Sequence, residues 1–178
     1  MSATAEYIQR LEALKEGERS RLRRLAGKPL DETLPGFDLF TALWWPLREN
    51  GKNAPRRETS WLVAKLYGSY PITHVPSEPS RETELQPILG KCEPKDERGR
   101  PRYRRKFDAL LCSSLSGIEP HLSWALSVAA GAVRIGKAPG LDWVRLLDDL
   151  SIWDRGEEHR RKRDIRDIWA EEYLRNTL

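Results

Sequence analysis

Residues 131–138 resemble a known nucleotide-binding motif, the phosphate-binding loop G-x-x-x-x-G-K-[ST]. Gly131, Gly136 and Lys137 stand at the motif's fixed positions, but position 138 is alanine, which has no hydroxyl to hold magnesium. The stretch also follows an expected helix, whereas the motif needs a strand before it to aim its amides at phosphate. We therefore interpret it as the glycine-capped end of a helix, and we do not expect a phosphate-loop enzyme.

Other residues that could act in catalysis or hold a metal do not converge. No histidine has a second ligand three or four positions away in a metal pattern; the histidines are His74, His121 and His159. Adjacent acidic residues diverge by about 100° on a helix, so we expect solvated faces for the pairs Asp148–Asp149, Glu157–Glu158 and Glu171–Glu172. No serine has a G-x-S-x-G setting. We expect no enzyme, no metal and no cofactor.

The remaining chemistry lies in clusters of basic residues, which could bind a phosphate backbone. Residues 98–106 hold six basic residues and no acidic one. The whole chain has 31 Lys plus Arg and 27 Asp plus Glu, so the clustering indicates more than the net charge of +4. With no recognition helix, zinc finger or RNA-binding sheet signature, we expect phosphate contacts with little reading of sequence. The candidate nucleic-acid-binding residues are Arg23, Arg24, Arg56, Arg57, Arg102, Arg104, Arg105, Lys106, Arg134, Lys137, Arg155, Arg160 and Arg161.

Apolar residues spaced by three and four predict that helices position these clusters. The expected helices cover residues 5–15, 18–25, 37–47 (broken by Pro46), 55–70, 85–89, 103–115, 121–133 and two segments within 140–174. Gly17 is expected to separate the first two helices, and residues 91–102 to form a mobile linker or loop. We find no period-two run and no hairpin signal, so we expect an all-α fold.

The last third of the chain shows the clearest pair of amphipathic helices. One apolar face is formed by Trp143, Leu146, Leu147, Leu150 and Trp153, and a second by Ile165, Ile168, Trp169 and Tyr173. Asp142 is placed to cap the first of these helices, and a basic segment joins the two. Most tryptophans are expected in the core, whereas Trp45 and Trp124 lie off the main apolar faces and could stack on bases.

The cysteines and the apolar segments indicate the compartment. Cys92 and Cys112 lie 20 residues apart, without a metal or redox spacing, which favours reduced thiols in a cytoplasmic protein. Residues 1–10 have no apolar core of signal-peptide length. Residues 122–135 are too short and too interrupted to cross a bilayer. We expect a cytoplasmic protein that makes no membrane contact.

Three blocks of sequence, in this order, carry a family resemblance. The blocks are 17–25 (GERSRLRRL), 104–107 (RRKF), and a C-terminal block in which Leu-Asp-Trp precedes a Leu-Leu-x-x-Leu run, Trp-Asp, a basic segment and a terminal helix. The chain thereby resembles the CasB family, the small subunit of the type I-E CRISPR surveillance complex, Cascade. Glu157 and Glu158 depart from the simplest family pattern, because they interrupt the basic segment.

The resemblance implies a fold, partners and a role. The implied fold is two small helical bundles, residues 1–92 and 93–178, packed into an elongated molecule. The implied partners are the guide RNA, the target DNA, the large, backbone and other Cascade subunits, and a second copy of the chain. The implied role is to contact the displaced and target strands and the guide RNA through basic surface, stabilising the R-loop in antiviral defence.

Within the candidate set, Arg56, Arg105 and Arg155 are expected to line one groove across both halves. They lie in basic clusters and match positions where CasB relatives carry basic residues, and the first two are expected near helix starts, where a cation opposes the dipole. Two rival functions can be tested against this one: a helical scaffold whose basic faces bind an acidic protein, and a phosphate-loop enzyme, which the motif does not favour. Competition by heparin or short duplex DNA tests the first, and a nucleotide-dependent shift in melting temperature tests the second.

Overall fold

The computed structural model describes residues 1–30, 34–50, 54–155 and 163–178. Every regular element in these ranges is a helix, so the all-α prediction is confirmed. The helices are α1 (Ala3–Glu12), α2 (Glu16–Arg24), α3 (Leu34–Asn50), α4 (Arg57–Ser69), α5 (Leu85–Lys91), α6 (Gly99–Cys112), the 3₁₀ turn η2 (Leu115–Gly117), α7 (Glu119–Arg134), α8 (Trp143–Ser151) and α9 (Ile165–Arg175).

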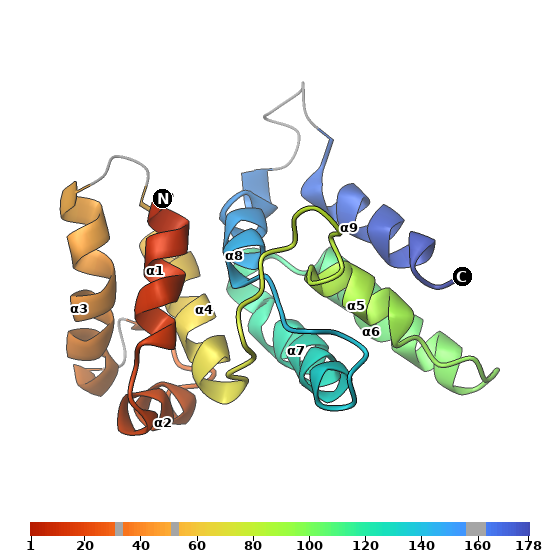
Figure 1. Cartoon of the computed structure of the whole chain (residues 1–178), viewed down its shortest axis with the longest axis horizontal. Helices are drawn as coiled ribbons and strands as arrows, with labels where there is room; N and C mark the ends of the chain where they lie inside the picture. Colours follow the sequence, from red (N-terminus) through yellow and green to blue (C-terminus); the bar gives the residue numbers. More distant parts are fainter. Residues whose placement is uncertain (31–33, 51–53, 156–162) are drawn as a thin grey trace.

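The helices lie side by side along the longest axis of the molecule, with α1 to α4 towards one end (Figure 1). Close packing of α2 on α4 requires Gly68, because a Cβ there would lie 2.7 Å from Leu22 Cβ. The hydroxyl of Tyr7 donates to the Ser60 carbonyl at 2.6 Å and joins α1 to α4. These contacts hold α4, which begins at Arg57 directly after Arg56, against α1 and α2.

Helix α7 is buried along one face, and α5 packs against both α7 and α9. Gly90 permits the α5–α9 crossing, because a Cβ there would meet the Tyr173 carbonyl oxygen. Although α5 precedes the proposed boundary at residues 92 and 93, its packing places it with the C-terminal helices (Figure 1). The division into two bundles itself stays a prediction.

The two groups of helices are joined by paired loops and by α8, which packs on α1 and α4. The Val75 amide donates to the Leu141 carbonyl at 3.1 Å, and the Leu141 amide donates to the Thr73 carbonyl at 3.0 Å. A Cβ at position 140 would lie 2.5 Å from the Thr73 carbonyl oxygen, so only glycine fits this approach. The Trp143 indole donates to the Ile72 carbonyl at 2.8 Å and anchors the start of α8.

Local capping accounts for several helix ends. Asp142 caps α8 as predicted, because its Oδ1 accepts from the Arg145 amide at 2.9 Å. At the end of α7, Gly136 has φ of +79°, and the Lys137 amide donates to the Ala132 carbonyl at 2.8 Å. This is a Schellman ending, so the stretch that resembles a phosphate-binding loop is a glycine-capped helix terminus, as predicted.

Several predictions of where helices break or begin were wrong. Helix α3 continues through Pro46, because buried Leu43 and Leu47 hold both sides of the proline in the core. Gly17 lies inside α2, and the break falls at residues 13–15 instead. Helix α6 begins at Gly99, within the predicted loop 91–102, because Asp96 Oδ1 accepts from the Gly99 amide at 2.5 Å and caps the helix.

Candidate nucleic-acid interface

Helix α6 carries the acid-free basic stretch, and its phase decides which cations face solvent. Tyr103, Phe107 and Leu110 are buried, at spacings of four and three residues. The opposite side of the helix therefore faces outward, and Arg102 and Arg105 are exposed there, one helical turn apart. No ion pair with a carboxylate is found for either of these two arginines within the described ranges.

Arg104 differs from its neighbours because it pairs with a buried carboxylate, although its own side chain is 48% exposed. Its guanidinium binds Glu93, whose carboxylate also accepts from the Tyr173 hydroxyl at 2.9 Å. Glu93 is 6% exposed. The hydrogen bond from Arg104 holds the pKa of Glu93 below its ordinary value, against the opposing effect of burial. Arg104 therefore has a role in the fold, which Arg102 and Arg105 do not share.

The two tryptophans proposed for base stacking differ in access. Trp124 is partly buried, and the Tyr103 ring packs edge-on against it with 5.2 Å between the ring centroids. The Lys106 ammonium lies 5.8 Å from the centroid of the Trp124 ring. The Lys106 contact is a cation–π interaction, so this lysine also has a local partner. Trp45 is 54% exposed on α3. Of the two rings, Trp45 is the more open to a ligand.

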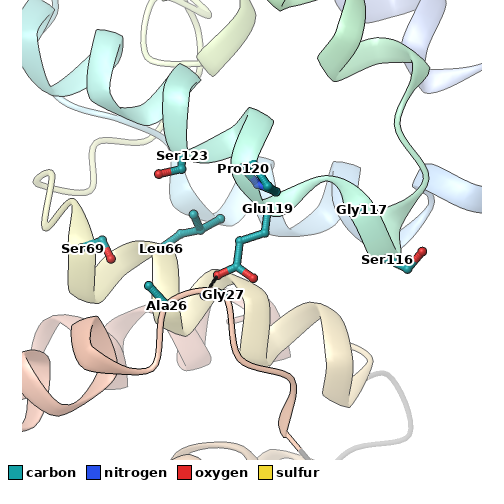
Figure 2. A pocket seen from close by; sticks show the side chains of 9 residues that line it. All are labelled: Ala26, Gly27, Leu66, Ser69, Ser116, Gly117, Glu119, Pro120 and Ser123. Carbon is teal, nitrogen blue, oxygen red and sulfur yellow. Dashed lines mark hydrogen bonds between the residues drawn. The ribbon is translucent and has the colours of Figure 1, made fainter.

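A cleft separates the N-terminal helices from the start of α7. It comprises two adjoining pockets of about 380 and 600 Å³, which share Gly27, Ser116 and Glu119. Figure 2 shows the smaller pocket, with the Glu119 side chain reaching towards Gly27. Arg56 and Asp154 both line the larger pocket, from the start of α4 and the turn after α8.

This cleft bears on the predicted groove through Arg56, Arg105 and Arg155. Arg56 lines it, and Arg155 follows a residue that lines it, but Arg105 is not among its lining residues. Arg105 also lies in the middle of α6 rather than near its start, because that helix begins at Gly99. Glu58, Glu119 and Asp154 line the same pocket, so it is less basic than the α6 surface.

Comparison with known proteins decides the family. The sequence profile of the family described as CRISPR-associated protein Cse2 matches residues 18–174. The chain belongs to the Cse2 family, also called CasB, of type I-E CRISPR-associated proteins. No curated protein matches.

Solved Cse2 structures share the fold. CasB from M. ruber superposes with a TM-score of 0.68 at 18% identity, covering 98% of this chain and 94% of that one. A CRISPR-associated protein of the Cse2 family from Thermus thermophilus gives a TM-score of 0.63 at 24% identity, covering 96% and 94%. A further structure, described as CasB from Thermus thermophilus, gives a TM-score of 0.63 at 23% identity, covering 96% of this chain and 94% of that one. The likeness extends over nearly the whole chain.

The other candidate cations of this Cse2 protein lie on elements other than α6. Arg23 and Arg24 lie in the last turn of α2, where Arg23 bonds Ser20 at 3.0 Å. Arg57 opens α4. Helices α2 and α4 lie at one end of the molecule, whereas α6 lies towards the other end (Figure 1). The exposed residues elsewhere are Arg134 and Lys137 at the end of α7, and Arg155 after α8, while Arg160 and Arg161 lie outside the described residues.

Sequence reasoning missed a buried ion pair in the cleft of this Cse2 chain. Lys65 is 4% exposed, and its ammonium donates to Glu119 Oε2 at 2.7 Å and to the Lys28 carbonyl at 2.9 Å. The other Glu119 oxygen accepts from the Gly27 amide at 2.7 Å. The pair joins α4 to α7 over 54 residues of sequence, and the one available signal was a lysine on an apolar helix face.

The adjacent acidic residues diverge, but not all are solvated. Asp148 accepts from the Thr4 hydroxyl at 2.8 Å, whereas Asp149 turns towards α9 and is 3% exposed. Glu172 is also buried and pairs with Arg81 at 3.1 Å. The prediction of solvated faces was wrong for Asp149 and Glu172, because helices packed over them. No cluster of three metal-ligating side chains occurs in the part of the chain that the structure describes.

None of the described helices is long and apolar enough to span a bilayer.

Proposed function

We propose that this Cse2 chain is the non-catalytic small subunit of type I-E Cascade and that it binds nucleic acid along α6. Family membership supports the first part. One observation supports the second: in an acid-free helix segment, Arg102 and Arg105 are exposed and lack a carboxylate partner among the described residues, while Arg104 between them is bound to Glu93. Two unneutralised guanidinium groups one turn apart suit contact with a phosphate backbone.

The helical geometry matches a phosphate strand better than a base edge. Arg102 and Arg105 are separated by about 4.5 Å along the helix axis, from a rise of about 1.5 Å per residue. Each strand of a DNA duplex carries one phosphate charge per about 3.4 Å of helix axis, so two long guanidinium side chains one turn apart can reach neighbouring phosphates of one strand. Binding should therefore be salt-dependent, with little sequence preference.

The proposed role follows from the energetics of R-loop formation. The RNA–DNA heteroduplex is about as stable as the DNA duplex that it replaces, so modest backbone contacts shift the balance. The α6 cations would supply such contacts to the displaced strand, the target strand or the guide RNA. The proposed protein partners are the large and backbone Cascade subunits and a second copy of this chain, and the proposed units are the two helical bundles.

The test compares charge-matched variants. Arg102→Gln and Arg105→Gln should each weaken binding of single-stranded DNA and lower the salt slope by about 0.7 per lost phosphate contact. Arg48→Gln on α3 removes the same charge from an exposed position and serves as the control. In reconstituted Cascade, R102Q/R105Q should shorten the R-loop lifetime. If the double variant binds single-stranded DNA with wild-type affinity and wild-type salt dependence, the nucleic-acid interface does not lie on α6.

The rival scaffold function is separated by competition. If the α6 surface binds an acidic protein instead, short duplex DNA should not bind the wild-type chain tightly at low salt and should not displace that protein. Sequence-independent DNA binding that R102Q/R105Q abolishes supports the nucleic-acid function.

A further inference from the structure

The turn after α7 presents an apolar side chain surrounded by cations. Ile135 is 66% exposed, the largest exposed fraction among the described large apolar side chains apart from those of the first and last residues. Arg134 precedes it and Lys137 follows two residues later, and both are exposed. We define these three residues as the α7 knob.

The backbone holds the knob in a fixed shape. Gly136 takes φ of +79°, and its amide donates to the Val133 carbonyl at 3.1 Å, while the Lys137 amide donates to the Ala132 carbonyl at 2.8 Å. This Schellman ending satisfies the last carbonyls of α7 and turns the chain sharply. Ile135 therefore protrudes from a rigid turn, so little conformational entropy is lost when a partner covers it.

The knob carries uncompensated positive charge. Residues 120–141 contain no Asp or Glu, and neither Arg134 nor Lys137 forms an ion pair within the described ranges. Lys91 at the end of α5 adds a third cation nearby, because Lys91 and Lys137 both act on the Cys92 thiol. Burial is the larger effect on that thiol and raises its pKa, while the two ammonium groups lower it.

Helix dipoles account for the cations but not for the isoleucine. Arg134 and Lys91 each lie in the last turn of a helix, where positive charge is favoured. The dipole does not stabilise the uncharged Ile135 side chain. Ile135 also lies outside the hydrophobic core, to which the apolar face of α7 belongs. A phosphate backbone offers little apolar surface to cover an aliphatic side chain, whereas a protein surface offers both carboxylates and apolar groups.

We propose that the α7 knob is a docking point for a protein subunit that presents an acidic segment around an apolar side chain. The proposal rests on the proposed membership of Cascade. It reassigns Arg134 and Lys137 from nucleic-acid contacts to a protein interface, with Ile135 as the buried anchor and the cations as a complementary rim. The knob and the α6 surface thus serve different partners.

The experiment measures association of this chain with the remaining Cascade subunits, purified together without it. Ile135→Ser should weaken association about tenfold or more, since truncated interface anchors commonly cost that much. Ile135→Leu should stay close to wild type. Arg134→Gln with Lys137→Gln should slow association and reduce its salt dependence. Single-stranded DNA binding by the isolated chain should be unchanged in all these variants.

The outcomes separate the two proposals. If the wild-type chain associates and Ile135→Ser associates equally well, the docking point is wrong and Cascade membership stands. If Arg134→Gln with Lys137→Gln lowers DNA affinity while association is unchanged, the cations belong to a nucleic-acid surface and the docking point is also wrong. If the wild-type chain fails to associate, both proposals fall.

Discussion

The indole N–H of Trp169 donates to Asp149 Oδ2 at 2.8 Å, and this contact joins α9 to α8 inside the protein. The other carboxylate oxygen lies 3.1 Å from Arg145 Nε. Burial raises the pKa of Asp149 to about 6, although Arg145 and the Trp169 hydrogen bond both lower it. A buried carboxylate thus links the two C-terminal helices, which the sequence presents as separate apolar faces.

Asp149→Asn should change the pH dependence of stability. Because the folded-state pKa is raised, the folded chain binds more protons than the unfolded chain between about pH 4 and pH 6, so this group's contribution to the unfolding free energy falls as pH rises through that window. As pH rises from about 4 to about 6, the unfolding free energy of the variant should increase relative to that of wild type by up to about 2–3 kcal/mol. Urea unfolding of both proteins across this range measures the difference, and a flat difference contradicts the assignment.

Arg102→Gln and Arg104→Gln should separate binding from folding. Arg104→Gln leaves Glu93 with only the Tyr173 hydroxyl, so the melting temperature at pH 7 should fall. The Glu93 pKa is lowered in the folded state, so the stabilisation exists above the unfolded pKa and is lost as pH falls through the folded one. The difference in melting temperature between Arg104→Gln and wild type should therefore shrink below about pH 4.

Arg102→Gln is the matched control for that measurement. It should leave the melting temperature unchanged at both pH values while weakening single-stranded DNA binding. Equal melting temperatures for the two variants at pH 7 would show that Glu93 needs no partner on α6.

Gly90→Ala and Gly131→Ala should have opposite effects. A Cβ at position 90 would collide with the Tyr173 carbonyl, so Gly90→Ala should destabilise by about 2 kcal/mol or more. Position 131 lies inside α7 with open space around its Cβ, so alanine there should stabilise by about 0.5–1 kcal/mol. Chemical denaturation measures both, and stabilisation by Gly90→Ala would refute the α5–α9 crossing.

Lys65→Met should be more harmful alone than in combination. The single change leaves the Glu119 carboxylate beside an apolar side chain, without the buried ammonium that neutralises it. The unfolding free energy should fall by about 3 kcal/mol. Adding Glu119→Gln removes the unpaired charge and should recover at least about 1 kcal/mol of that loss. A double-mutant cycle by urea unfolding gives the coupling, and strict additivity would show that the pair does not interact.

The sequence alone determined the features that depend on neighbours along the chain. The three-and-four spacing of Trp143, Leu146 and Leu150 predicted a face that is buried, and Asp142 predicted the cap that starts their helix. Gly136 predicted the end of α7 in the same way. These predictions succeeded because helix faces and caps follow from backbone geometry within one or two turns.

Tertiary structure decided what each charged residue does. Adjacent arginines 104 and 105 look alike in sequence, yet one binds Glu93 and the other faces solvent, because α5, α7 and α9 contact only one side of α6. Packing carried α3 through Pro46, and it buried Lys65 against Glu119, a carboxylate 54 residues away. Such pairings depend on contacts between segments distant in the chain, which local periodicity does not encode. The sequence therefore identified the basic helix, and only the fold distinguished its structural arginine from those left free to bind.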